Sequence, residues 1–291
     1  SGGYIMNIAL AYVINKQLDE MIVGKTIRKV IANQNPHTFV WFAMEPARAF
    51  KDDRAATDVA QYLINKTIDK VDVNTGRYGL YNFIYVGNRA LMSDIVPRYT
   101  HPKEKPAKKH QLLMEFEDGS YLSFSASLGG ALFLFETDKN GDPIGYKSDF
   151  PLINKDEFTY EFFKSLVNKE KGRTLSVKQL LATKNRIPGI DNSLLQDILW
   201  EAQINPKSKI ENLSEEDFCR LFAAIKAVPS EIIAAGGKDI DKDIYGNLGG
   251  FSSKVSRNTV GKPCHRCGTA IIKEAYLGGS VFYCPTCQKM K

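Results

Sequence analysis

The chain opens with apolar residues at helical spacing. They recur every three to four positions from Ile8 to Ile22, and Gly24 follows. This period keeps apolar side chains on one face of an α-helix, and glycine commonly follows the last helical turn. The pattern predicts an amphipathic helix that ends at Gly24.

Short β-rich runs come next along the chain. The Asp-Gly pair at 118–119 is typical of a turn that joins two strands. Eight segments of this kind are residues 26–33, 37–42, 68–74, 80–86, 89–96, 111–119, 120–127 and 131–137. Eight short strands after a single helix predict a β-sandwich or a flattened barrel.

After about residue 150 the period becomes helical again. The helical segments are residues 157–171, 176–185, 193–204 and 214–237. A stretch rich in Gly, Asn and Asp, residues 236–261, then leads to the C-terminus. We therefore expect an α+β protein with an N-terminal helix and eight-stranded β-sandwich in residues 1–150, a helical domain in residues 151–236, and a linker with a terminal module in residues 237–291.

The charge is unevenly distributed. The whole chain has a formal net charge of +6, and the segment from Ser252 to Lys291 has seven basic residues and one acid, Glu274. The rest of the chain carries equal numbers of basic and acidic residues. A basic end on a neutral body fits a polyanionic partner, although a merely soluble basic tail has the same composition.

No apolar run reaches the roughly 18 to 20 residues that a bilayer span needs, and the first residues lack the layout of a secretory signal. We expect a cytoplasmic monomer that does not enter a membrane.

Four of the five cysteines have the spacing of a metal site. Cys264 and Cys267 form one Cys-x-x-Cys pair, and Cys284 and Cys287 form a second pair after sixteen intervening residues. Such pairs bring four thiolates to one structural Zn²⁺. Two disulfides are the alternative, which the absence of a secretory signal disfavours. The fifth, Cys219, lies in a helical segment and is expected to be a buried core thiol.

Three segments of the chain carry motifs of one known family. Residues 261–289 hold the four cysteines together with Phe-Tyr-Cys-Pro and Cys-Gln-Lys endings. Residues 176–206 contain Pro-Gly-Ile-Asp-Asn at 188–192, and residues 23–30 follow the first helix. In this order the segments resemble the C-terminal zinc finger, the helix-two-turn-helix element and the segment after the first helix of the formamidopyrimidine-DNA glycosylase and endonuclease VIII family. The resemblance covers nearly the whole chain in the right order. It implies a DNA-binding protein similar to enzymes of base-excision repair.

The resemblance also implies which residues contact DNA. Gly189 allows a sharp turn before a helix, and Asn192 at that helix start can donate an amide N–H to a phosphate. An ordinary N-cap role for Asn192 is the structural alternative. In the finger, which the family lays along DNA, the basic residues Lys262, Arg266 and Lys273 fit phosphate contacts.

The catalytic residues of the family are missing. Its members begin Pro-Glu-Leu-Pro-Glu, and the N-terminal proline amine attacks the sugar of the damaged nucleotide. An ungapped alignment puts Met6 at that proline, Asn7 at the glutamate, and Ala9 and Leu10 at the second Pro-Glu. Because residues 1–5 precede Met6, we expect no free amine there, and asparagine cannot exchange a proton as a carboxylate does.

Two further departures affect DNA contacts. Gly279 stands where the family's finger usually has an arginine, and Asp191 replaces the usual glycine beside Asn192. A carboxylate near a phosphate site repels DNA unless it turns away.

These observations favour a catalytically silent protein that binds damaged or distorted double-stranded DNA through phosphates. One alternative is an active glycosylase or lyase that uses a different amine, such as that of Ser1 or of a lysine like Lys16. Another is a protein-interaction module built on the same scaffold.

Overall fold

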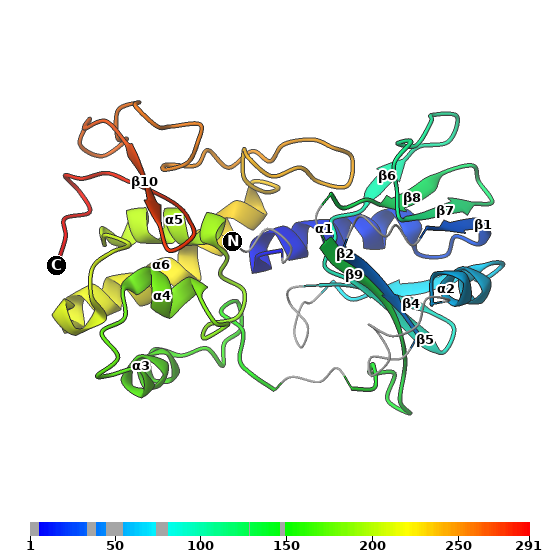
Figure 1. Cartoon of the computed structure of the whole chain (residues 1–291), viewed down its shortest axis with the longest axis horizontal. Helices are drawn as coiled ribbons and strands as arrows, with labels where there is room; N and C mark the ends of the chain where they lie inside the picture. The colour runs from blue at the N-terminus through cyan, green and yellow to red at the C-terminus, as the bar shows by residue number, and fades with distance from the viewer. Residues whose placement is uncertain (1–5, 34–38, 45–54, 74–80, 128, 146–148) are drawn as a thin grey trace.

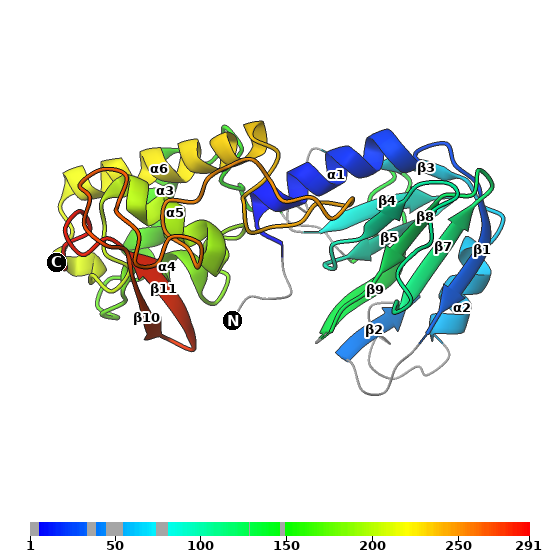
Figure 2. The ribbon, with the colours of Figure 1, turned by 90° about the horizontal axis from the view of Figure 1, so that it is seen from above.

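A long N-terminal helix joins the two halves of the molecule. The computed structural model describes residues 6–33, 39–44, 55–73, 81–127, 129–145 and 149–291. Helix α1 (Ile8–Ile22) crosses from the helical half to the β-rich half (Figures 1 and 2). Ile8 packs into the helical core, whereas Ile14 and Leu18 pack into the β core. The amphipathic helix predicted here is therefore present, and its apolar side chains serve two cores.

Two packed sheets form the β-rich half. One has the order β1-β7-β8-β6, and the other has the order β2-β9-β5-β4-β3. Neighbouring strands are antiparallel except for β2 and β9, which are parallel. The strands are β1 (Ile27–Ala32), β2 (Phe39–Ala43), β3 (Ile68–Val71), β4 (Asn82–Val86), β5 (Arg89–Ser93), β6 (Arg98–Thr100), β7 (Leu112–Phe116), β8 (Tyr121–Phe124) and β9 (Gly129–Glu136). Side chains from both sheets, such as Leu91 and Phe124, meet in one core.

The predicted fold class is confirmed, with two additions. The described residues form nine strands in these sheets, one more than predicted. The additional strand, β6, was missed because it has only three residues, directly after Pro97, and so gives too short a pattern to detect. Helix α2 (Ala55–Leu63) was also not expected; it contacts β1 and β2. Its buried face contains Ala55, Ala56 and Val59, and alanine contributes little to a hydrophobic pattern.

The helical half contains α3 (Tyr160–Lys169), α4 (Val177–Ala182), α5 (Asn192–Ala202), a short 3-10 helix (Ile210–Asn212) and α6 (Glu215–Ala234). Capping boxes begin two of these helices, through Ser176 at α4 and Ser214 at α6. Cys219 on α6 is exposed, so the prediction of a buried thiol is wrong. It lies on the solvent side of a helix whose apolar stripe is supplied by other positions, including Phe218 and Leu221.

Residues 238–251, which we call the strap, return from the helical half to the β-rich half and run beside α1 (Figure 2). Ile244 is fully buried in the β core, and its carbonyl accepts a hydrogen bond from Tyr99 N at 2.7 Å. Gln17 Nε2 on α1 donates to Asp243 Oδ2 at 3.0 Å. The stretch predicted to be a simple linker is therefore partly a packed element of the β-rich half.

The chain ends in a hairpin of two antiparallel strands, β10 (Ile272–Tyr276) and β11 (Gly279–Tyr283). It lies against α5 (Figure 1). Among the helices of the described residues, none is long and apolar enough to cross a bilayer.

Candidate nucleic-acid interface

The four predicted zinc ligands come together at the base of this hairpin. Their sulfur atoms all lie within 4.8 Å of one another. The Sγ–Sγ distance is 4.0 Å for Cys264 and Cys287 and 3.4 Å for Cys267 and Cys284. A tetrahedral Zn²⁺ with Zn–S bonds of about 2.3 Å needs sulfur atoms about 3.8 Å apart. The four thiols therefore fit one structural zinc ion.

The zinc module is fixed to α5 through Trp200. The indole Nε1 donates to Cys264 Sγ at 3.3 Å. The guanidinium of Arg266 lies 4.0 Å from the centre of the indole ring and donates to the Trp200 carbonyl at 3.2 Å. Arg266, for which the sequence predicts a DNA contact, therefore stacks on the indole of Trp200.

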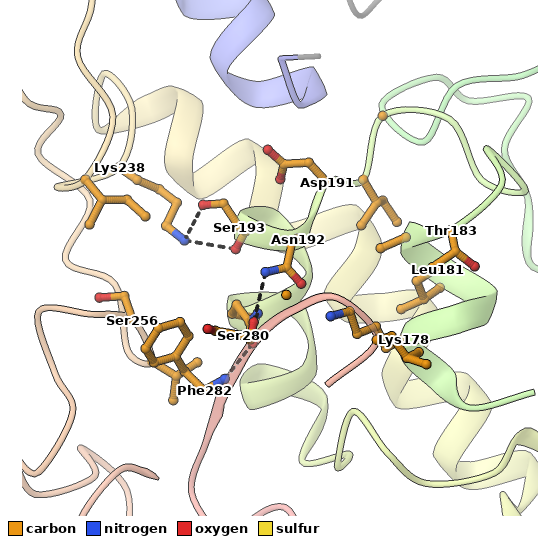
Figure 3. A pocket seen from close by; sticks show the side chains of 18 of the residues that line it. Lys178, Leu181, Thr183, Asp191, Asn192, Ser193, Lys238, Ser256, Ser280 and Phe282 are labelled. Carbon is orange, nitrogen blue, oxygen red and sulfur yellow. Dashed lines mark hydrogen bonds between the residues drawn. The ribbon is translucent and has the colours of Figure 1, made fainter. Parts of the chain in front are cut away.

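Side chains from α4 and α5 hold the hairpin on both strands. Lys178 Nζ donates to the Tyr276 carbonyl at 2.7 Å. The Ser280 carbonyl accepts hydrogen bonds from Asn192 Nδ2 at 2.9 Å and Gln196 Nε2 at 3.1 Å (Figure 3). Gln196 Oε1 also accepts from Phe282 N at 3.0 Å. The hairpin is therefore positioned by the same helices that form the helix-two-turn-helix element.

A cavity of about 680 Å³ lies between these elements (Figure 3). Its walls come from Met6 just before α1, from α4 and the turn after it, from the start of α5, from residues of the strap and the segment after it, and from the hairpin. The polar residues that line it include Lys178, Asn185, Asp191, Asn192, Ser193, Gln196, Lys238 and Arg257. The cavity thus brings together the position aligned with the family's proline and the predicted phosphate-binding turn.

Asp191, not Asn192, caps α5. Asp191 Oδ1 accepts a hydrogen bond from Leu194 N at 2.7 Å, so the N-cap alternative for Asn192 is wrong. A carboxylate accepts this bond as well as an amide oxygen does, and the helix therefore begins one residue earlier than the alternative assumed. Gly189 has a φ of +103°, and a Cβ there would lie 3.3 Å from Ile8 Cβ. The turn therefore needs glycine for its backbone conformation and for the close approach of α1.

Met6 lines the cavity, and Asn7 follows it at the start of α1. The Met6 side chain is buried, and Asn7 Oδ1 caps α1 by accepting from Leu10 N at 2.9 Å. Asn7 Nδ2 donates to Asp191 Oδ2 at 3.4 Å. The backbone of α1 contacts the same turn, since Ile8 N donates a hydrogen bond to the Gly189 carbonyl at 3.0 Å. The start of α1 is thus fastened to the turn before α5.

Two half-buried carboxyl groups, those of Asp191 and Asp241, interact near this contact. Burial raises the pKa of Asp191, and the hydrogen bond from Leu194 and the charge of Lys238 oppose that shift. Burial, together with repulsion from Asp191, raises the pKa of Asp241 to about 6. Both carboxyl groups therefore favour their neutral forms more than exposed aspartates do.

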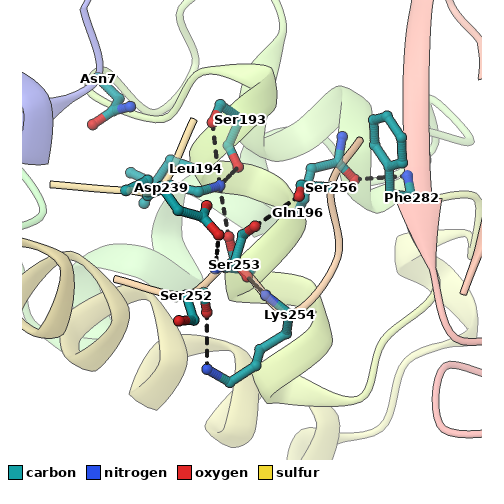
Figure 4. A network of polar contacts seen from close by, with 12 residues as sticks. Asn7, Ser193, Leu194, Gln196, Asp239, Ser252, Ser253, Lys254, Ser256 and Phe282 are labelled. Carbon is teal, nitrogen blue, oxygen red and sulfur yellow. Dashed lines mark hydrogen bonds and ion pairs between the residues drawn. The ribbon is translucent and has the colours of Figure 1, made fainter. Parts of the chain in front are cut away.

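Lys238 forms a buried ion pair beside them. Its Nζ lies 2.6 Å from Asp197 Oδ2, with both side chains 1% exposed. Asp197 Oδ1 accepts from Lys254 N at 2.8 Å, and Asp239 Oδ2 accepts from Ser253 N at 3.2 Å (Figure 4). This network ties the strap and the segment after it to α5.

The sequence did not single out the two lysines of the cavity. Burial lowers the pKa of Lys178, which is only 4% exposed. The sequence did contain a signal for this lysine. Lys178 directly follows Val177 in a predicted helix, which places its cation next to the buried face of that helix. Among the described residues that line the cavity, Lys262, Arg266 and Lys273 do not appear. Lys262 and Lys273 are exposed outside it.

The C-terminal finger matches a known family of zinc fingers. Residues 261–289 match the model of a "zinc finger found in FPG and IleRS". With the clustered cysteines, this match establishes one structural zinc ion.

The overall fold matches solved structures along nearly the whole chain. A complex between Lactococcus lactis Fpg and DNA containing an abasic site superimposes with a TM-score of 0.77 at 23% identity, covering 97% of this chain and 99% of that one. Fpg from Thermus thermophilus gives a TM-score of 0.74 at 19% identity, covering 98% and 99% of the two chains.

Curated relatives extend the match in sequence. Formamidopyrimidine-DNA glycosylase from Lactobacillus delbrueckii is 25% identical over 284 residues, covering 95% of this chain and 96% of the relative. The enzyme from Pelotomaculum thermopropionicum is 30% identical over 232 residues, covering 77% and 83%. This identity over most of both chains, joined to the shared fold and finger, shows that the chain belongs to the formamidopyrimidine-DNA glycosylase family.

Proposed function

We propose that this chain binds damaged or distorted double-stranded DNA without cleaving it. The observation that carries the proposal is that Met6, which lines the cavity, is a buried packing residue and that Asn7 beside it caps α1. A thioether cannot form a Schiff base, and a neutral amide cannot act as general acid or base. The positions aligned with the family's proline and glutamate therefore lack the groups that the reaction needs.

Several features support binding to DNA. A related protein has been solved in complex with DNA containing an abasic site. In this chain the turn at Gly189 and the amide of Asn192 face the cavity, and one N–H of that amide is left over beside the bond to Ser280. Lys262, Arg266 and Lys273 supply positive charge on the finger. Contacts of this kind hold phosphates and give affinity without reading sequence.

The test combines a binding assay with borohydride trapping, using duplex DNA that carries an abasic site. We expect binding that weakens linearly with salt on a log-log plot, with a slope of about 0.9 per phosphate contact. We expect no covalent adduct, because borohydride traps only a Schiff base. A robust adduct would contradict catalytic silence, and the absence of binding to any DNA would contradict the proposed function as a whole.

A lyase that uses Lys178 is the second candidate. This lysine lines the same cavity as Met6, and burial lowers its pKa, which favours the nucleophilic neutral amine. If an adduct forms, Lys178→Met should abolish it, whereas the matched variant Lys273→Met on the exposed face of the finger should keep it. Peptide mapping of the adduct then identifies the attacking amine.

Restoring the family residues tests the scaffold directly. Removing residues 1–5 and making Met6→Pro and Asn7→Glu recreates the nucleophile and the carboxylate. A glutamate at this position meets the carboxylate of Asp191, so the variant also needs Asp191→Gly. Because Ala9 and Leu10 still differ from the family, we expect at most weak lyase activity. Any gain of trapping in this variant supports a cleft that still binds DNA.

A further inference from the structure

The tip of the hairpin has an unusual residue for its conformation. The register pairs Tyr276 with Gly279, which leaves Leu277 and Gly278 as a two-residue turn. Their φ angles are 54° and 77°. Turns with two positive φ angles are usually Asn-Gly or Asp-Gly, because the left-handed conformation brings a branched or bulky side chain close to the backbone. Leucine is therefore strained at this position.

Leu277 also gains little from packing within the free protein. Its side chain is 48% exposed, at the rim of the cavity. Strained residues persist where the surrounding structure imposes them, and they gather at ligand-binding sites. An exposed apolar side chain held in a strained turn beside a cavity therefore points to contact with a ligand.

Side chains of α4 and α5 hold the two strands next to the turn. Lys178 fixes the Tyr276 carbonyl on one strand, and Asn192 and Gln196 fix the Ser280 carbonyl on the other. These anchors lie directly on both sides of the turn (Figure 3). Leu277 is thus presented by a preorganised hairpin, which lowers the entropy lost when the side chain contacts a partner.

The chemistry around the tip fits nucleic acid as the partner. A Cβ built at Gly279 would lie 3.5 Å from Lys178 Nζ and 3.8 Å from Asn192 Nδ2, so cationic and amide donors lie next to the apolar tip. The exposed Lys273 lies on the same hairpin. Along a DNA strand, phosphates alternate with the apolar faces of deoxyribose and base. The tip has the complementary groups, because hydrogen-bond donors for phosphate lie beside an apolar side chain.

We propose that Leu277 is an apolar DNA contact, which packs against sugar and base surface while neighbouring donors bind phosphate. This inference rests on the proposed function and adds to it a contact that releases no counterions. Proteins that bend or open DNA commonly use such apolar side chains. Gly279 stands where the family usually has an arginine, so an apolar contact from Leu277 takes the place of a charged contact that this chain lacks.

The test measures DNA affinity across a salt series for the wild type and three variants. Leu277→Ala should bind about three- to tenfold more weakly, as expected for a partly buried leucine, with an unchanged slope against salt. Leu277→Met should bind within about twofold of the wild type, since it keeps the apolar surface. Leu277→Asn should bind weakly but melt at the same temperature or higher, because asparagine tolerates the left-handed conformation.

Leu248→Ala is the matched control, because Leu248 is 57% exposed on the strap, outside the cavity lining. It should leave affinity unchanged. If the wild type binds DNA and Leu277→Asn binds equally well, or if Leu277→Ala changes the salt slope, the inference fails and the proposed function stands. If the wild type binds no DNA, both fail.

Discussion

Asn7 and Asp191 are 184 positions apart in the sequence, yet the amide of the first donates to the carboxylate of the second at 3.4 Å. Both residues depart from the pattern of the family. Asn7 stands at the position of its glutamate, and Asp191 at that of its glycine. Each also caps a helix, α1 and α5 respectively. The two departures therefore form one contact that joins the N-terminal helix to the predicted DNA-binding turn.

This contact predicts coupling between the two positions. Asn7→Asp keeps the cap but places two carboxylates together, so we expect the free energy of unfolding near pH 8 to fall by about 1–3 kcal/mol. Combining it with Asp191→Asn exchanges the two side chains and should recover most of that loss. Urea unfolding of the four proteins measures the coupling. Additive effects would show that the side chains do not interact.

The half-buried Asp241 predicts a dependence of stability on pH. Its pKa is about 6 in the folded chain against an ordinary value of 3.8. Between these values the folded state binds more protons than the unfolded state, so stability falls as pH rises from about 4 to about 6 and stays lower above that range.

Asp241→Asn removes this dependence. We expect it to raise the free energy of unfolding at pH 7.5 by about 1–3 kcal/mol and to change it little at pH 4. Asp19→Asn, at an exposed position of α1, is the control and should change stability little at either pH. An equal effect of Asp241→Asn at both pH values would refute this origin of the dependence.

The hairpin anchors should separate binding from stability. Asn192→Ala removes a proposed phosphate donor and should weaken DNA binding about five- to tenfold for every sequence tested, with an unchanged salt slope because no cation is lost. Gln196→Ala leaves the backbone N–H of Phe282 without its acceptor and should lower the melting temperature more. Calorimetry and fluorescence anisotropy of both variants measure these effects. A larger affinity loss for Gln196→Ala would mean that Asn192 acts only as an anchor.

Zinc removal should be visible in the fluorescence of Trp200, whose indole donates to Cys264. In a Trp41→Phe background, a chelator should shift the emission to longer wavelength while most helical circular dichroism remains, because the metal organises its own module. Cys264→Ser should behave likewise without a chelator, and Cys219→Ser should retain zinc. Native reduced protein that contains no zinc would contradict this prediction.

The sequence predicted features that depend on local pattern. Cysteine spacing located the zinc site, and the hydrophobic period located α1. The sharp turn at Gly189 also follows from nearby residues.

Features that depend on distant partners were not predictable in this way. Either Asp191 or Asn192 could cap α5 by residue type. The choice depends on distant partners, because Asp191 contacts Asn7 of α1 and Asn192 contacts the hairpin. The exposure of Cys219 depends on which side of α6 meets the core. The role of Lys178 became apparent only when the hairpin, about a hundred positions further on, was placed beside it.

The strap has a consequence for how the chain reaches its native state during synthesis. Ile244 completes a core whose last strand, β9, ends at Glu136. Gln17 on α1 likewise has no hydrogen bond to Asp243 until the strap has been synthesised. During synthesis the β-rich half therefore leaves the ribosome with the apolar surface that Ile244 covers still exposed. The strap covers this surface only after the helical half has been made. Fragments that end near residue 150 should expose this surface and aggregate, although they contain every strand of both sheets.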